Sequence, residues 1–203
     1  MRFRALALSA ALTGFLAQPA SAVIHLWDIS EVYSNADGSV QFVEFFTTGN
    51  FENVWSATGL RSEANDRRVD FFSNVPAGTA DRHVLLATPG FADLPGGVTP
   101  DFEIPVGFFD PTGDTLVFGR VSVLDTLSFA PGQLPTDGVT ALHRTLELPS
   151  PEAPSVAGPD DLFAALNSPT NFAGETGRLV PEPGTALLLG AGLAVLARGR
   201  RLP

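Results

Sequence analysis

The chain has 203 residues, with 22 acidic and 12 basic side chains and a formal net charge of −10 at pH 7. It contains no cysteine, which excludes disulfide bonds, thiol catalysis and cysteine-based zinc sites. The acidic charge disfavours nucleic acid as a partner, because two polyanions repel each other.

The N-terminus has the parts of a secretory signal peptide. A basic start, Met1–Arg4, precedes an apolar run over residues 5–17, and Ala20 and Ala22 form an A-x-A cleavage site. We therefore expect signal peptidase to remove residues 1–22. The alternative of an uncleaved signal anchor is disfavoured by so well-formed a cleavage triplet.

Residues 23–149 are predicted to form an all-β domain. Gly, Pro, Asn and Asp interrupt this stretch roughly every ten residues, which leaves little room for a long helix and is typical of a sandwich or barrel. Twelve of the chain's sixteen phenylalanines lie in this stretch and supply large apolar groups for one core. The expected strands cover residues 24–33, 39–47, 69–72, 83–87, 102–106, 114–118, 121–129 and 139–145.

Three other stretches are predicted to be irregular or helical. Residues 49–68 carry Trp55 among several charged side chains, so we expect a long exposed loop with one anchored aromatic ring. Pro149–Pro159 has the Pro, Ser and Ala composition of a linker. Asp160–Leu166 predicts a short helix, because its acidic residues would lie at the helix N-terminus. Residues 150–180 are thus expected to be a linker followed by a short helix.

Candidate catalytic and metal-binding residues are sparse. His25, His83 and His143 fall on three different expected strands without the spacing of a compact metal site, so polar strand positions explain them better. The sequence contains no Gly-x-Ser-x-Gly elbow, phosphate-binding glycine loop or His-Glu-x-x-His. We therefore assign no catalytic, cofactor-binding or metal-binding residue and expect no cofactor.

Acidic residues gather in several expected loops. Asn35, Asp37, Gly38 and Glu44 occupy four offsets of the EF-hand calcium pattern, but Tyr33 stands where the leading carboxylate belongs, so an ordinary β-hairpin is favoured. Carboxylates also lie close together in residues 101–103 and 110–114. They leave a weak divalent-cation site open, with a solvated acidic surface as the simpler interpretation.

Three acidic residues, Glu31, Glu44 and Asp125, interrupt apolar strand rows and are the candidates for an acid–base pair. Catalytic carboxylates must face each other across a substrate cleft. We instead expect these three to accept hydrogen bonds from backbone donors at strand ends or bulges, because a buried charge needs partners.

Seven short motifs run through the body of the chain in a fixed order. They are Ile29–Val32, Phe42–Phe45, Pro76–Thr79, Gly113–Val117, Val123–Leu127, Leu142–Arg144 and Asn167–Thr170. These motifs, in this order, resemble those of the lamin tail domain of bacterial exported proteins. Thr47 and the 49–68 loop depart from the pattern of that family. The resemblance implies an immunoglobulin-like antiparallel β-sandwich that serves as an interaction or accessory module and shares no catalytic residues.

The last residues have the composition of a membrane-directed tail. In order, they are Pro181, Glu182 and Pro183, the apolar run 184–197, and the basic residues Arg198, Arg200 and Arg201. The apolar run would rise only about 20 Å as a helix, against a hydrocarbon core of about 30 Å, which suits transient insertion into the inner membrane. The arginines would hold that end in the cytoplasm.

This tail, residues 181–203, resembles the PEP-CTERM sorting domain. The resemblance implies recognition by an exosortase, a membrane protease-transpeptidase of Gram-negative bacteria, with cleavage near the Pro-Glu-Pro. A plain C-terminal membrane tail is the simpler alternative. After processing, residues 23–180 would carry seven arginines against 21 acidic residues, a charge of about −14.

Together these features predict an exported, non-enzymatic protein of the cell surface or extracellular matrix. We expect a role in adhesion or in exopolysaccharide and biofilm organisation, with exopolysaccharide or other surface proteins as partners. Two alternatives remain open: an accessory module that binds glycan or a divalent cation, and a hydrolase with a dispersed carboxylate site.

Overall fold

The computed structural model describes residues 24–145 and 155–180. The two expected processing signals, residues 1–22 and 181–203, lie outside this part of the chain, as does the expected membrane segment 184–197. Within the described part, no helix has the length and apolar composition needed to cross a bilayer.

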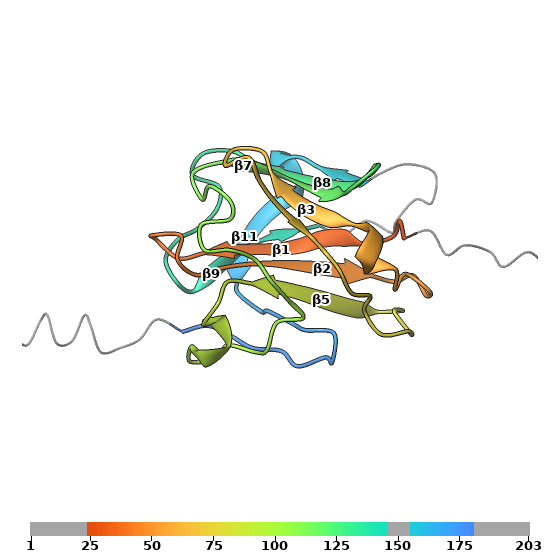
Figure 1. The fold of residues 1–203 in the computed structure, drawn as a ribbon. Helices are drawn as coiled ribbons and strands as arrows, with labels where there is room; N and C mark the ends of the chain where they lie inside the picture. Colours follow the sequence, from red (N-terminus) through yellow and green to blue (C-terminus); the bar gives the residue numbers. More distant parts are fainter. Residues whose placement is uncertain (1–23, 146–154, 181–203) are drawn as a thin grey trace, which may run out of the picture.

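The described residues form two β-sheets with three short 3-10 helices beside them. Figure 1 shows β3, β7 and β8 in the upper layer and β1, β2 and β5 in the lower one. The six-stranded sheet has the order β11 (Leu162–Leu166), β9 (Thr140–Arg144), β1 (Asp28–Ser34), β2 (Gln41–Thr47), β5 (Arg82–Ala87) and β6 (Phe102–Glu103). The five-stranded sheet has the order β10 (Ser155–Ala157), β8 (Val123–Phe129), β7 (Asp114–Gly119), β3 (Gly59–Ser62) and β4 (Arg67–Asp70).

Most neighbouring strands are antiparallel, as the sequence predicts. The exceptions are the edge strands β6 and β10, which pair in parallel with β5 and β8. Both are only two or three residues long. Short edge strands limit the unpaired backbone that a sheet exposes, which lowers the tendency of sheets to pair edge to edge.

The main core lies between the two sheets. In β7, alternate residues are buried and their neighbours are only partly so, which places Leu116 and Phe118 in this core. Trp55, in the 3-10 helix η1 (Trp55–Ala57), is completely buried at its centre. Five rings lie with their centroids 5.1 to 5.5 Å from the Trp55 ring: Trp27, Phe45, Phe71, Phe102 and Phe118. Such pairs stabilise the fold by about 0.5–1.5 kcal/mol each beyond their burial.

The outer face of the six-stranded sheet is covered as well. Tyr33 and Phe42, which pair across β1 and β2, pack there against Phe91 of η2 (Phe91–Asp93) and against Leu179. Leu179 belongs to residues 167–180, which we call the C-terminal strap (blue in Figure 1). Both faces of this sheet therefore contact apolar side chains.

The helix predicted over Asp160–Leu166 is wrong. Pro159–Asp161 form a single 3-10 turn, η3, and β11 follows at once and pairs with all five residues of β9. A seven-residue run is too short to be stable as an isolated helix, whereas β9 offers hydrogen-bonding partners along its edge. The stretch predicted as a linker also contributes a strand, because Ser155–Ala157 form β10.

The long exposed loop predicted over residues 49–68 is wrong as well, whereas the anchored aromatic ring expected within it is confirmed. Trp55 lies in the core, and the chain then forms a hairpin of β3 and β4. Arg67 and Arg68, whose charges favoured a loop, occupy exposed positions of β4. The strand predicted over residues 102–106 is limited to β6, two residues long.

Candidate functional site

The C-terminal strap is fixed to the body at its last residues. The Leu179 N–H donates to Asn167 Oδ1 at 2.6 Å, and Asn167 Nδ2 donates to the Leu179 carbonyl oxygen at 3.1 Å. Leu179 is 3% exposed and Asn167 is 1% exposed. Val180 donates its N–H to the Pro95 carbonyl oxygen at 3.3 Å. The body thus holds the chain up to the residue before Pro181, with no spacer between them.

Gly96 permits the strap to lie this close. Its φ is +82°, in the left-handed region, and its carbonyl oxygen accepts the Arg178 N–H at 2.9 Å. A Cβ atom on Gly96 would fall on the Arg178 carbonyl oxygen. A side chain there is therefore excluded by the strap as well as by the backbone conformation.

Four polar side chains form a row across four neighbouring strands on the strap side of the six-stranded sheet. Glu31 of β1 and Glu44 of β2 lie directly opposite each other. His143 Nε2 of β9 is 3.7 Å from Glu31 Oε1, and His83 Nδ1 of β5 is 2.8 Å from Glu44 Oε1. We call these four residues the carboxylate–histidine row.

The strap closes over this row. Ser168 donates its N–H to Glu31 Oε1 and its hydroxyl to Glu31 Oε2, both at 2.9 Å. Thr170 donates its N–H to Glu44 Oε2 at 2.6 Å. The side chains of Glu31 and Glu44 are 2% and 5% exposed. The prediction that these carboxylates accept backbone hydrogen bonds is confirmed, and they hold the strap on the sheet.

Burial shifts the pKa of two residues of the row, Glu31 and His143. It raises the pKa of Glu31 to about 8, and the nearby Glu44 carboxylate adds to that rise. Burial also lowers the pKa of His143. A proton on Glu31 at neutral pH relieves its repulsion with the neighbouring Glu44 carboxylate.

Asp125 lies apart from the row, in the core between the sheets. Its side chain, 0% exposed, accepts the Ile29 N–H at 2.7 Å and two hydrogen bonds from Arg144 Nη1, at 2.9 and 3.0 Å. Ile29 lies at a bulge of β1 and Arg144 on β9, whereas Asp125 comes from β8 of the other sheet. Burial raises the pKa of Asp125 to about 6, although the Arg144 charge opposes this. Asp125 therefore links the two layers.

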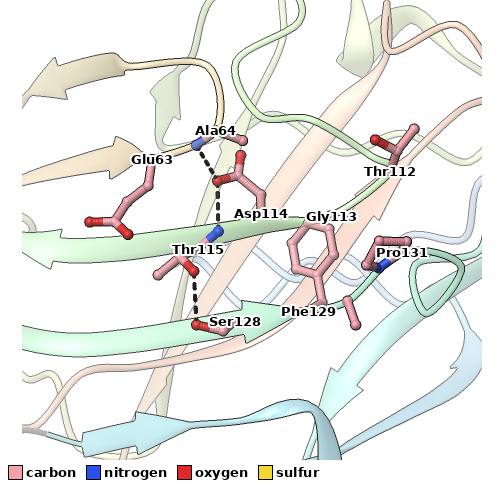
Figure 2. Close-up of a pocket in the computed structure, with 10 residues that line it drawn as sticks. Glu63, Ala64, Thr112, Gly113, Asp114, Thr115, Ser128, Phe129 and Pro131 are labelled. Atoms are coloured by element: carbon pink, nitrogen blue, oxygen red, sulfur yellow. Dashed lines mark hydrogen bonds between the residues drawn. The ribbon is translucent and has the colours of Figure 1, made fainter.

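An open pocket of about 530 Å³ lies beside β7 and β8 (Figure 2). Asp114, on its wall, accepts the N–H groups of Ala64 at 2.9 Å and Thr115 at 2.6 Å through Oδ1. Its Oδ2 accepts the Ser62 hydroxyl at 2.6 Å and the Asp110 N–H at 3.0 Å. Four donors surround this carboxylate, so its role is to tie the β3–β4 hairpin to β7.

The segment with the EF-hand-like spacing forms a hairpin. Asn35 donates its N–H to the Val40 carbonyl oxygen at 2.9 Å, and Gly38 takes a positive φ of 71°. Glu44 lies away from this turn, in the carboxylate–histidine row. In residues 24–145 and 155–180, no group of three His, Asp or Glu side chains has a geometry suited to a metal ion.

The sequence did not predict that the four residues of the carboxylate–histidine row lie side by side. Its four residues lie on four strands, and the strand order that makes them neighbours depends on long-range pairing. His25 lies elsewhere, with Nδ1 3.4 Å from Glu52 Oε1. The signal that could have found the row is the need of a buried glutamate for a partner on an adjacent strand.

The residues assigned to processing lie outside the described residues. They are Ala20 and Ala22 near the N-terminus, and Pro181, Glu182, Pro183, Arg198, Arg200 and Arg201 in the tail. The structure adds the strap, which leads directly to the second group.

Comparison with protein families supports the tail prediction. Residues 179–201 match the PEP-CTERM protein-sorting motif. Searches of curated proteins and of solved structures give no match. The lamin tail resemblance of the body therefore stays a prediction. The chain carries a PEP-CTERM motif, which implies export, membrane anchoring during sorting, and processing by an exosortase.

Proposed function

We propose that this is a non-enzymatic protein of the bacterial surface or extracellular matrix, where its β-domain acts in adhesion or in exopolysaccharide organisation. The observation that carries the proposal is the PEP-CTERM motif, which begins on a residue hydrogen-bonded to the folded body. A motif that directs export and processing thus follows a compact β-domain without a spacer.

The surroundings of the acidic residues support a non-enzymatic role. Glu31 and Glu44 face each other, as an acid–base pair would, but the strap covers them and takes up their hydrogen bonds. Asp125 is held by a backbone N–H and an arginine in the core. An acid–base pair needs access to a substrate, so these contacts favour a structural role over the hydrolase alternative.

The two-layer arrangement also supports an immunoglobulin-like sandwich of the lamin tail type as the fold of the body. Such domains present loops at the ends of their sheets, and loops tolerate the sequence variation that recognition requires. The exposed loops are accordingly the contact surfaces we propose for the β-domain.

Protease shaving of the native host tests the proposed location. Intact cells treated with protease should release fragments of residues 23–180, and mass spectrometry of the mature protein should place its C-terminus near residue 180. Glu182→Ala should leave unprocessed chain in the membrane fraction, whereas Glu103→Ala, at an exposed position of β6, should be processed normally. Full-length chain confined to the cytoplasm would contradict the proposal.

A further inference from the structure

A pocket of about 650 Å³ lies where the strap meets two loops at one end of the six-stranded sheet. It lies between the β1–β2 hairpin, the loop before β9 and the last residues of the strap. We call it the loop pocket. The lining residues that matter here are Tyr33, Asp37, Val40, Leu94, Asp137 and Leu179.

Tyr33 gives this pocket a hydroxyl group. Its side chain is 3% exposed and stacks on Phe42, with ring centroids 5.1 Å apart and an angle of 10° between the planes. No residue of the described chain forms a hydrogen bond with its hydroxyl. The hydroxyl itself is reached by solvent, so it can take a hydrogen-bonding partner from outside the protein. A ligand in the pocket would supply the hydrogen-bonding partner of this hydroxyl.

Two carboxylates line the pocket, one from the β1–β2 turn and one from the loop before β9. Asp37 Oδ1 accepts the N–H of Ser39 at 3.0 Å and its hydroxyl at 2.6 Å. Asp137 accepts the Thr140 N–H at 2.7 Å through Oδ1 and the Thr140 hydroxyl at 2.7 Å through Oδ2. These bonds lower the pKa of both carboxyl groups, which keeps them ionised at neutral pH. Both therefore present oriented acceptors.

The walls between these polar groups are apolar. Val40, Leu94 and Leu179 line the pocket and belong to, or pack against, the cluster that contains Tyr33. A sugar ring matches this arrangement, because its C–H face packs on apolar side chains and its hydroxyls donate to carboxylates and accept from a phenol. An acidic sugar would be repelled by the two aspartates.

We propose that the loop pocket binds a neutral saccharide unit, with Tyr33, Asp37 and Asp137 as its hydrogen-bonding partners. This rests on the proposed surface function and specifies the ligand class for it. The unit could belong to an extracellular polysaccharide or to the saccharide part of an outer-membrane lipid, which share this chemistry.

Affinity electrophoresis of the full chain in detergent tests the proposal. The gels contain dextran, mannan or galactan as neutral probes, alginate as the acidic probe, or the host's own extracellular polysaccharide or lipopolysaccharide in separate arms. At least one neutral probe or host saccharide should retard the chain, and alginate should not. Retardation by one host arm and not by the other identifies the source.

Two variants and a matched control locate the binding. Tyr33→Phe keeps the stacked ring and removes only the hydroxyl, and Asp37→Asn removes one charge; each should weaken binding at least tenfold. Asp110→Asn is the control, because Asp110 forms the same kind of turn, with Thr112, away from this pocket. Thermal melting shows whether each variant is folded.

The inference is overturned if no neutral saccharide is retained, if alginate is retained equally, or if the two pocket variants bind as well as the control. These outcomes are independent of the surface location, which protease shaving reports. A chain displayed on the surface without saccharide binding refutes the pocket assignment alone. A chain that binds saccharide and stays in the cytoplasm refutes the proposed function alone.

Discussion

Asn167 satisfies both backbone groups of Leu179 with one side-chain amide. The amide of Asn167 forms the hydrogen bonds that the backbone of a neighbouring strand would form in a sheet. It thereby holds the end of the C-terminal strap on the body. Pro181, the first residue of the Pro-Glu-Pro, follows two positions later. The stability of the body and the presentation of the sorting motif therefore depend on the same contact.

Replacing Asn167 by Ala should loosen the strap. The substitution removes both hydrogen bonds to the Leu179 backbone and a third from Asn167 Nδ2 to the Val139 carbonyl oxygen, at 2.6 Å. This should lower the free energy of unfolding by about 1–3 kcal/mol. Hydrogen exchange at the Leu179 and Val180 amides should become faster. Asn65→Ala serves as the control, because Asn65 Nδ2 donates to the Gly107 carbonyl oxygen at an exposed position, at 3.2 Å. Unchanged exchange at Leu179 in Asn167→Ala would contradict the anchoring role.

Gly96 and Gly90 offer a matched pair for the close approach of the strap. Their φ angles are +82° and +81°, so an alanine at either position incurs about the same backbone strain, of roughly 1–2 kcal/mol. A Cβ on Gly90 meets open space, whereas one on Gly96 meets the Arg178 carbonyl oxygen. Gly96→Ala should therefore lower the melting temperature more than Gly90→Ala and expose the 178–180 segment to protease. Equal effects of the two substitutions would show that the strap does not press on Gly96.

Glu31 should make the protein less stable as the pH rises. Because its folded pKa is raised to about 8 from an ordinary 4.5, the folded state holds a proton that the unfolded state releases. Its contribution is complete below about pH 4.5 and is lost as the pH rises to about 8. Glu31→Gln should remove this dependence on pH. Between pH 4.5 and 8, the unfolding free energy of the variant should therefore rise relative to that of the parent protein.

Chemical denaturation at several pH values measures this difference. The lowered pKa of His143 makes stability rise with pH, and the raised pKa of Asp125 makes it fall. Both residues are present in the two proteins, so subtracting the parent's stability curve from the variant's removes their effects. Glu63→Gln is the control, since Glu63 is exposed and forms an ion pair only with the exposed Arg61 among the described residues. A difference that stays flat between pH 4.5 and 8 would show that Glu31 is ionised in the folded state.

Asp125→Ala should be the most damaging of the acidic substitutions. It leaves the Ile29 N–H without its acceptor and Arg144 without its closest carboxylate, and breaking a buried pair costs about 3–5 kcal/mol. Asp70→Ala removes surface ion pairs with Arg68 and Arg120 and should have little effect. Urea unfolding of both variants measures the contrast, and similar midpoints would argue against Asp125 as the link between the sheets.

Strands that alternate locally could be predicted from the sequence. The expected segments 39–47, 83–87, 114–118 and 139–145 overlap β2, β5, β7 and β9, because apolar and β-branched residues recur between turn formers there. The hairpin after β1 was also predictable, since Asp37-Gly38 supplies the positive φ that the turn needs.

Elements that depend on a distant partner could not be predicted in this way. The run that forms β11 has helix-favouring alanines and leucines, and only its pairing with β9 makes it a strand. β3 and β4 are short, and their arginines, Arg61, Arg67 and Arg68, are exposed, so no run of alternating apolar residues marks them in the sequence. The carboxylate–histidine row arises from the order of the strands in the sheet. The bulge between Ile29 and Glu31 changes which residues of β1 point to each face, and simple alternation along the sequence does not reveal this change.

The absence of a spacer between the strap and Pro181 has a mechanical consequence. A domain joined to its attachment point by a flexible linker tumbles independently of that point. Here Val180, the residue before Pro181, is hydrogen-bonded to Pro95 of the body, so a group joined directly to Val180 would be held beside Pro95. Such a group would lie next to the loop pocket, whose lining includes Val180.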